Sequence, residues 1–285
     1  MRHARPVLLV LVLCTAFAAT AAQAQVAGFR VDSWSTDDGL PSTFISEMVQ
    51  TKDGYLWLAA GGSLVRFDGF DFHVYSGATD SALSARVNNL YAGIGDTLWL
   101  ALENRKILAM ANGRLTGVTT VPAGYGSALS QDSRGHLLVL GTAIWRWSNG
   151  RFDSLPVPAG WQAITSHVWR DGLGQSWTIG RDDALLRVTD RGGEIVGHGT
   201  GPNVTFYPAR RQALAVRRRG ALGEVVDGTG VVLAAFPWGA GVRPLLVDRS
   251  GRLWVFQVPN DLRVYGPGST EPLARIAFPS GFNFG

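Results

Sequence analysis

The chain has 285 residues, of which 46% are hydrophobic and only 17% are charged, and it contains 36 glycines and 10 tryptophans. This composition argues against a helical protein, which would carry more Lys and Glu, and favours many short strands joined by tight turns. The formal net charge of +4 is small for this length, so the overall charge gives no support to a nucleic-acid-binding protein.

The first 24 residues have the pattern of a secretory signal peptide. Arg2 and Arg5 precede an apolar stretch from Val7 to Ala19, and Ala22-Gln23-Ala24 is a small-residue cleavage site. A membrane anchor is disfavoured because the apolar stretch is short for a span. We therefore predict cleavage after Ala24 and an exported, periplasmic protein. The single cysteine, Cys14, would leave with the signal, so the mature chain would contain neither a thiol nor a disulfide.

Residues 25–285 are predicted to form one repetitive domain. Phe29–Trp34 reads as a strand without a hairpin of its own. The stretch 53–69 then reads as turn, strand, turn, strand, turn, because Asp53-Gly54 and Asp68-Gly69 are turn dipeptides and Gly61-Gly62 separates two apolar runs. Two apolar strands joined by Gly-Gly predict a β-hairpin. An isolated hairpin is marginal in water, so this one needs copies to pack against.

Such copies recur with a nearly constant period. The residue near the start of the second strand lies at positions 57, 99, 138, 177, 216 and 254, which are 42, 39, 39, 39 and 38 residues apart: Trp57, Trp99, Leu138, Trp177, Val216 and Trp254. A period near 40 with about four short strands per unit is typical of a β-propeller blade. We interpret the tryptophans at these positions as core residues that pack on the neighbouring blade, and not as ligand platforms.

Each unit is predicted to contain four strands. The first unit has strands at about Phe44–Gln50, Tyr55–Ala60, Leu64–Phe67 and Phe72–Ser76. The third has them at Ser127–Gln131, Leu137–Gly141, Ile144–Trp147 and Phe152–Leu155. The last has them at Arg243–Val247, Leu253–Val258, Leu262–Tyr265 and Leu273–Phe278. The six predicted blades cover approximately residues 42–80, 85–121, 124–158, 162–198, 202–237 and 241–278.

The two ends of the repeat suggest how the ring closes. After the sixth blade, residues 279–285 resemble the start of another unit. Propellers commonly close by completing one blade with strands from both ends of the chain, which hides the edges. We therefore expect a seven-bladed ring that is left incomplete at Gly285, with Phe29–Trp34 as the closing outer strand. The alternative is a six-bladed ring with loose ends.

One basic cluster stands out in the fifth unit, namely Arg210-Arg211 with Arg217-Arg218-Arg219. A surface that binds nucleic acid is one interpretation. A solvated strand edge that blocks edge-to-edge aggregation is the favoured one, because an exported protein rarely meets nucleic acid.

The first unit resembles a known family. The segments Trp34–Ser42, Asp53–Ala59 and Leu64–Gly69, with Ile45 and Gln50 between them, are similar to the opening of the two-component regulator propellers, the periplasmic sensor regions of bacterial membrane receptors. The resemblance covers roughly residues 29–278, is weaker in later units and weakest in the fifth. It implies a ligand-sensing domain that precedes an immunoglobulin-like domain, a membrane span and a histidine kinase or diguanylate cyclase transmitter in complete members. Oligosaccharide fragments are the ligand class that the family suggests.

Catalytic and metal-binding patterns are weak in this sequence. The histidines occupy unlike places in their repeats, without zinc-site spacing: His73, His136, His167 and His198. Four aspartates precede Gly turns and could suggest calcium, but hairpin chemistry is favoured: Asp53, Asp132, Asp171 and Asp248. No nucleophile elbow or phosphate loop is evident. We therefore expect no catalytic residues, no metal and no cofactor in this chain.

Ligands of propellers bind where the loops of several blades meet. The polar residues that fall just before the inner strands, or between second and third strands, are the weak candidates for ligand binding: Arg86, Asn88, Arg105, Arg181, Asn203 and Asn260.

Three functional hypotheses remain open at the level of the sequence. The first is a periplasmic ligand-sensing domain, not catalytic by itself, whose ligand alters its packing against a downstream transmitter. The second is a secreted propeller enzyme of the lyase or lactonase type. The third is a protein-binding scaffold. A homodimer is compatible with each of them, and a membrane span and transmitter encoded beyond Gly285 would separate the first from the others.

Overall fold

The computed structural model describes residues 32–122, 128–141, 143–161, 168–170, 175–180, 184–198, 205–208, 213–226, 232–248 and 250–278. The strands of this part of the chain form six four-stranded sheets, and neighbouring strands within each sheet are antiparallel and follow one another in the sequence. We number the sheets 1 to 6 in chain order. Each sheet is therefore a simple meander, as the hairpin repeat predicts.

The bounds of the elements are as follows. Sheet 1 contains β1 (Ile45–Gln50), β2 (Leu56–Ala60), β3 (Ser63–Phe67) and β4 (Phe72–Tyr75), and sheet 2 contains β5 (Val87–Ala92), β6 (Leu98–Leu102), β7 (Lys106–Ala111) and β8 (Arg114–Thr120). Sheet 3 contains β9 (Ala128–Gln131), β10 (Leu137–Leu140), β11 (Ile144–Ser148) and β12 (Arg151–Leu155), and sheet 4 contains β13 (Trp169–Arg170), β14 (Ser176–Ile179), β15 (Ala184–Thr189) and β16 (Gly192–His198). Sheet 5 contains β17 (Thr205–Pro208), β18 (Ala213–Arg219), β19 (Leu222–Val226) and β20 (Val232–Pro237), and sheet 6 contains β21 (Val242–Val247), β22 (Leu253–Gln257), β23 (Asp261–Tyr265) and β24 (Pro272–Ala277). A short 3-10 helix, η1 (Thr36–Asp38), precedes them.

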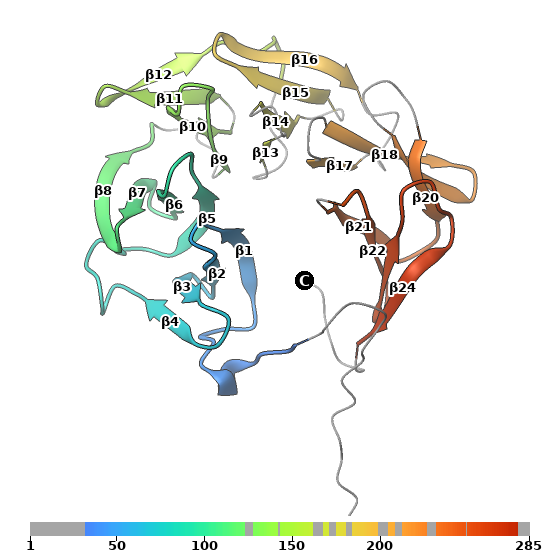
Figure 1. Cartoon of the computed structure of the whole chain (residues 1–285). Helices are drawn as coiled ribbons and strands as arrows, with labels where there is room; N and C mark the ends of the chain where they lie inside the picture. Colours follow the sequence, from blue (N-terminus) through green and yellow to red (C-terminus); the bar gives the residue numbers. More distant parts are fainter. Residues whose placement is uncertain are drawn as a thin grey trace, which may run out of the picture.

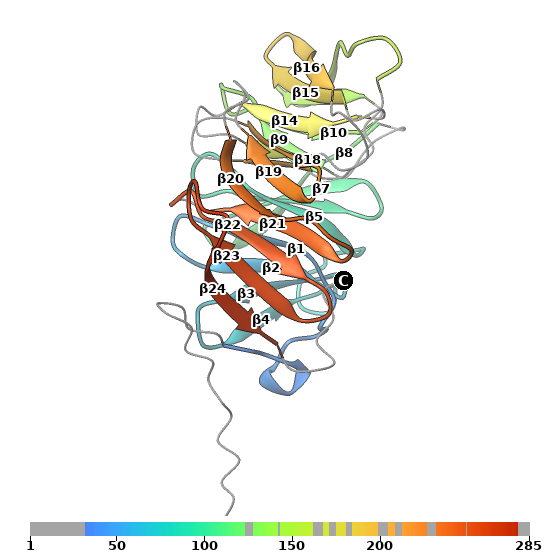
Figure 2. The same ribbon diagram turned by 90° about the vertical axis from the view of Figure 1, so that its right-hand side faces the viewer.

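The sheets are arranged around a common axis (Figure 1). The first strand of each sheet is innermost and the fourth is outermost, so that β1 lies beside β5, β5 beside β9, and β17 beside β21. From the side, β21 to β24 run next to one another as one twisted sheet (Figure 2). This arrangement confirms the prediction of an all-β propeller.

The strand predictions agree closely with the structure in the three units where bounds were given. Each predicted strand of sheets 1, 3 and 6 ends within one residue of an observed strand. The predicted closing strand is different. Its first residues, 29–31, and the signal segment 1–24 lie outside the described residues, and Asp32–Trp34 belong to no strand. The Trp34 ring instead packs edge-on against Phe67 and Phe72, with centroids 4.9 and 6.4 Å away. Within Asp32–Trp34, packing of the Trp34 side chain therefore attaches the chain to sheet 1.

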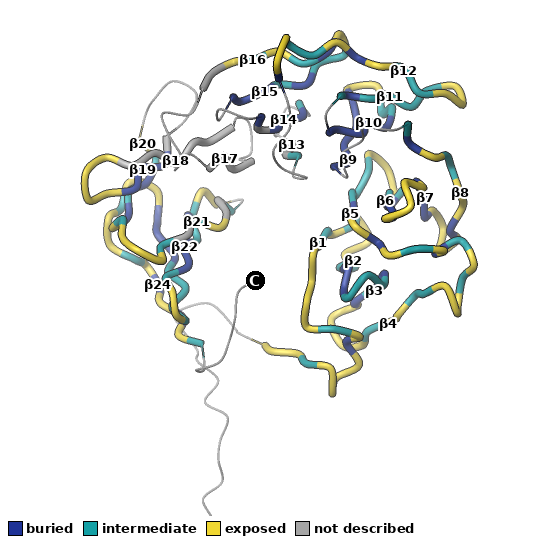
Figure 3. The backbone as a smooth tube through the Cα atoms, turned by 180° about the vertical axis from the view of Figure 1, so that it is seen from behind, coloured by how far each residue is buried: buried dark blue, intermediate teal, exposed yellow. Residues whose placement is uncertain are grey.

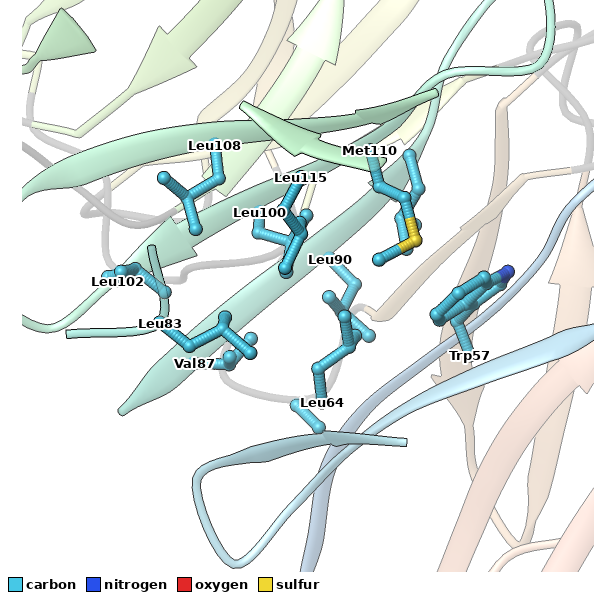
Figure 4. Packing of buried hydrophobic residues seen from close by; sticks show 12 residues of the cluster. Trp57, Leu64, Leu83, Val87, Leu90, Leu100, Leu102, Leu108, Met110 and Leu115 are labelled. Atoms are coloured by element: carbon cyan, nitrogen blue, oxygen red, sulfur yellow. The ribbon is translucent and has the colours of Figure 1, made fainter. Parts of the chain in front are cut away.

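The core lies between the faces of successive sheets. In sheet 1, burial is concentrated on β2 and β3, whereas the inner strand β1 and the outer strand β4 are more exposed (Figure 3). In sheet 3 the inner strand β9 is buried throughout. Trp57 is only 6% exposed and packs with Leu64 of its own sheet and with Leu90 and Met110 of sheet 2 (Figure 4). The prediction that Trp57 packs on the neighbouring sheet is thus confirmed.

The turn between the first and second strands carries a hydrogen-bonded cap. In sheet 3, Asp132 Oδ1 accepts the backbone N–H groups of Arg134 and His136 at 2.9 and 2.8 Å. In sheet 6, Asp248 Oδ1 accepts those of Ser250 and Arg252 at 2.8 and 3.0 Å. Hairpin chemistry is therefore the role of these two aspartates, and Asp171 lies outside the described residues.

Asp53 also makes hydrogen bonds within its own turn, as predicted, but it occupies a different position from these two aspartates. Thr51 occupies the cap position in sheet 1. Its backbone N–H donates to Tyr55 O at 3.1 Å, and the backbone N–H of Asp248 makes the equivalent bond to Arg252 O at 2.9 Å in sheet 6. Asp53 lies two residues later and accepts a hydrogen bond from Thr51 Oγ1 at 2.6 Å. The Asp-Gly dipeptide at 53–54 hid this difference, because Asp132 and Asp248 each stand three residues before their Gly, as Thr51 does.

Candidate functional site

The candidate ligand-binding residues share one end of the sheets. In an antiparallel meander, the turns between second and third strands lie at the same end as the connections to the next sheet. We call this end the loop face. Arg86, Asn88, Arg105 and Asn260 all fall there and are described, whereas Arg181 and Asn203 lie outside the described residues.

Arg86 lies where the connection from sheet 1 enters sheet 2. Its side chain packs across the Gly61-Gly62 turn, so that a Cβ atom added at Gly62 would lie 2.9 Å from Arg86 Nε. Gly62 also has a φ of +90°, a conformation that favours glycine. Both glycines and Arg86 line a cavity of about 220 Å³ between sheets 1 and 2. Among the described residues, none hydrogen-bonds or pairs with the exposed Arg86 guanidinium, which can therefore meet an acceptor on a ligand.

Asn88 lies in an irregular part of the innermost strand. The register of β5 against β6 shifts between Val87 and Asn89, and that of β1 against β2 shifts between Ile45 and Glu47. Ser46 and Asn88 are the extra, bulged residues that have no partner in the facing strand, and both are exposed. Such bulges are common beside binding sites because they re-aim a side chain. The structure thus repeats the same irregularity at the loop face of two adjacent sheets.

Arg105 is joined to Arg86 through the backbone. Glu103 N–H donates to Arg86 O at 2.8 Å, and Val121 N–H donates to Arg105 O at 3.0 Å. Arg105 adopts a φ of +69°, which is unusual for a residue other than glycine. The turn that carries Arg105 is therefore held against the connection that carries Arg86, and two of the predicted residues come together.

A buried polar pair beneath the loop face had no signal in the sequence analysis. Asn89 is only 4% exposed, and its Nδ2 donates to Glu47 Oε2 at 3.0 Å, from sheet 2 to sheet 1. A buried amide with a charged partner fixes the relative position of two sheets, because either group alone would be costly to bury. The immediate neighbours of these residues are the exposed Ser46 and Asn88, so the pair positions the candidate site from below.

Asn260 serves the structure of its turn. Its Nδ2 donates to Phe278 O at 2.6 Å, and its carbonyl accepts Phe278 N–H at 2.8 Å. Next to it, Asp261 Oδ2 accepts hydrogen bonds from Arg263 Nε at 2.8 Å and Arg275 Nη2 at 2.7 Å. Partial burial alone would raise the pKa of Asp261, but the hydrogen bonds from Arg275 and Arg263 hold it below its ordinary value. Asn260 is thus a turn residue, and the loop face of sheet 6 is rigid.

Within the described residues, no group of three or more His, Cys, Asp or Glu side chains is placed to hold a metal ion. The described histidines whose surroundings are given lie away from the loop face: His73 in the outer strand β4, and His136 in the first turn of sheet 3, where its Nδ1 lies 2.9 Å from Asp132 Oδ2. The described chain also has no helix that is long and apolar enough to cross a membrane.

Comparison with known proteins gives structural matches only. No protein-family model matches the chain, and no curated protein is similar to it in sequence. Virginiamycin B lyase from Staphylococcus aureus matches with a TM-score of 0.62 and 15% identity, over 85% of this chain and 86% of the lyase. YCF48 from Cyanidioschyzon merolae matches with a TM-score of 0.62 and 14% identity, over 86% of this chain and 88% of that protein.

A third match comes from a signalling protein. The extracellular domain attributed to a hybrid two-component system of B. thetaiotaomicron matches with a TM-score of 0.58 and 14% identity. The match covers 85% of this chain but only 37% of that domain. At these identities the matches show the propeller fold alone, and that fold serves a lyase, a signalling receptor and YCF48 alike.

Proposed function

We propose that this chain is the ligand-binding propeller of an exported bacterial sensor, and that its ligand binds at the loop face of sheets 1 and 2. The observation that carries the proposal is the convergence there of the unpaired Arg86 guanidinium, the turn at Arg105 and the two bulged residues Ser46 and Asn88. The resemblance of residues 34–69 to two-component regulator propellers supports the sensor role. So does the likeness to the extracellular domain of a hybrid two-component system.

A lyase is the second candidate, and one observation speaks against it. One of the matched lyase structures is described as a catalytically inactive histidine-to-alanine variant bound to quinupristin. In this chain, the described histidines His73 and His136 lie in an outer strand and in a turn at the opposite end from the loop face, and His198 ends the outer strand β16 of sheet 4, not sheet 1 or 2 where Arg86 and Asn88 lie. Arg86, Asn88 and Arg105 can bind a ligand, but they do not include an evident general base. Binding without turnover is therefore the simpler role.

We also propose that a seventh sheet completes the ring next to sheet 1. Glu47 and Val49 of β1 contact sheet 2. Met48 points to the other face, because successive side chains of a strand alternate. Met48 is 58% exposed, and Ile45, which lies on the same face because it pairs with Ala60 as Met48 pairs with Leu58, is 42% exposed. An apolar row on the innermost strand is the surface that a further blade would cover.

The sensor proposal is tested by binding and by recovery of the ligand. Purified protein is screened against a panel of oligosaccharides by thermal shift, and each hit is re-examined with Arg86→Ala and Asn88→Ala. We expect a hit that raises Tm, loses its effect in both variants, and is recovered chemically intact after prolonged incubation. A ligand that is cleaved or rearranged would favour the lyase. A ligand whose effect survives both substitutions would place the site elsewhere.

A further inference from the structure

A second cavity lies between sheets 1 and 2, at the end opposite the loop face. Its volume is about 440 Å³, within the range of small-molecule sites. Three turns form it: the first turn of sheet 1 at 51–55, the corresponding turn of sheet 2 at Asp96, and the last turn of sheet 2 at Asn112 and Gly113. We call it the turn-face cavity. None of the candidate ligand-binding residues lines it.

One wall of the turn-face cavity is aromatic. Tyr55, Trp57 and Tyr75 line it, and the rings of Trp57 and Tyr75 lie 5.7 Å apart at an angle of 37°. The indole is held in place because its Nε1 donates to Thr51 Oγ1 at 3.1 Å. Leu98, which is 1% exposed, extends the apolar lining. A fixed, flat and apolar wall of this kind suits a ring compound, which stacks or packs edge-on without reorganising the protein.

Two cations line the same cavity. The Arg66 guanidinium lies over the Tyr55 ring, 4.5 Å from its centroid, and its Nε is buried without a hydrogen-bond partner. Lys52 is exposed at the rim. Among the described residues, neither cation takes part in an ion pair. A buried donor that lacks an acceptor within the protein is a place where a bound group can supply one.

Among the described residues, the acidic residues of the lining form no ion pair with these cations. Asp53 Oδ1 is used within its own turn, where it accepts hydrogen bonds from Thr51 Oγ1 at 2.6 Å and Tyr55 N–H at 3.4 Å. Asp96 belongs to the turn of the other sheet. The negative charge of Asp96 would repel a polyanion, because some of the ligand's charges would have to lie close to it. A ligand with a single carboxylate can place that group away from Asp96. The cavity thus combines donors for a single anionic group with an aromatic wall.

We propose that the turn-face cavity binds a small aromatic carboxylate, whose carboxylate meets Arg66 and Lys52 and whose ring packs against Trp57 and Tyr75. The planar guanidinium is suited to the two coplanar oxygens of a carboxylate. A sugar ring would need several hydrogen-bonding partners around its hydroxyl groups, and the wall formed by Trp57 and Leu98 is apolar. This site goes beyond the proposed function at the loop face. The turn-face cavity and the cavity lined by Arg86 share no polar residue other than Tyr75.

The test is a calorimetric titration of the full chain with benzoate, benzamide and glucuronate. We expect benzoate to bind and benzamide, which has the same ring without the charge, to bind about tenfold more weakly or not at all. Glucuronate has the carboxylate without the aromatic ring and should not compete. Arg66→Met and Lys52→Ala should each weaken benzoate binding about tenfold, with an unchanged far-ultraviolet circular dichroism spectrum.

Lys106 provides a matched control. It is the other lysine of the chain, and it begins β7 at the loop face, where its Nζ lies 3.2 Å from Ser84 Oγ. Lys106→Ala makes the same charge change as Lys52→Ala and should leave benzoate affinity unchanged. Absence of benzoate binding, equal binding of benzamide, preference for glucuronate, or equal effects of the two lysine substitutions would each overturn the proposal. Lys52→Ala decides the matter if Arg66→Met does not fold, because Lys52 is exposed.

Discussion

Replacing Asp248 tests whether the capped turns hold the sheets together. Its carboxylate accepts four hydrogen bonds, from the backbone N–H groups of Ser250 and Arg252, from Arg252 Nε at 2.7 Å and from Trp254 Nε1 at 3.1 Å. The Arg252 side chain is 36% exposed, so its ion pair contributes little. The other three bonds contribute a net ~1 kcal/mol each, so Asp248→Ala should lower the free energy of unfolding by about 3 kcal/mol. For a chain of this size that is a fall in Tm of about 6–12 °C.

The assay is thermal unfolding followed by circular dichroism. Asp153→Ala is the control, because Asp153 makes an exposed ion pair with Arg151 at 3.2 Å, a contact worth less than about 1 kcal/mol. A fall in Tm for Asp248→Ala no larger than that for Asp153→Ala would refute the reasoning that these caps stabilise the repeat.

The same carboxyl group gives a dependence on pH with a definite sign. Partial burial acts to raise the pKa of Asp248, but hydrogen bonds from Trp254, Arg252 and Ser250 outweigh it and lower the pKa. A carboxyl group with a lowered pKa stabilises the folded state above its unfolded pKa of about 4, and this contribution is lost as the pH falls through the folded value. The Tm difference between the wild type and Asp248→Asn should therefore be full at pH 7 and should shrink below about pH 4. A difference that grows on acidification would contradict the assigned role.

Three further substitutions test the sheet contacts and the loop face. Asn89→Leu removes the buried bond to Glu47 and should cost about 1–3 kcal/mol in urea unfolding, whereas an unchanged midpoint would show that the pair does not join the sheets. Gly62→Ala forces a side chain into a φ of +90° and against Arg86, so it should lower Tm and weaken any loop-face ligand, and a neutral effect on both would argue against the packing described. Met48→Asp should be nearly neutral if that face of β1 is solvated, and should cost more than about 2 kcal/mol if a further sheet covers it, as chemical denaturation can decide.

The repeat was predictable because its signals are local. The tryptophan period and the turn glycines recur in nearly every unit, so the strand bounds could be predicted to within one residue. A side-chain cap could not be placed from the dipeptide alone. Thr51 and Asp248 both cap their turns, yet only one of them is an aspartate. The chemistry that they share is an oxygen acceptor facing an indole N–H, and that is visible only once the turn is folded.

The contacts between sheets were not predictable, because they join residues about 40 positions apart without a pattern of their own. Asn89 and Glu47 are one example, and Ser130 with Ser176 is another, with hydroxyl oxygens 2.5 Å apart between sheets 3 and 4. The loop-face candidates were named from their place in the repeat. That reasoning named Arg86, Asn88 and Asn260 alike, and it could not foresee that the amide of Asn260 is used by its own turn.

The candidate sites lie where the chain departs from its own repeat. Gly93 occupies the cap position of sheet 2, 42 residues after Thr51, and has no side chain to accept from Trp99, whose buried Nε1 has no partner among the described residues. Gln131 of sheet 3 reaches across instead, and its Oε1 accepts Ile94 N–H at 2.5 Å. The turn of sheet 2 thus departs from the repeat, because an indole N–H that Thr51 accepts in sheet 1 and Asp248 accepts in sheet 6 has no acceptor among the described residues of sheet 2. The turn that contains Gly93 also carries Asp96, which lines the turn-face cavity. The unpartnered Nε of Arg66 is by contrast a regular feature, because Arg146 and Arg187 occupy the same place in sheets 3 and 4 and their Nε atoms also lack a partner among the described residues.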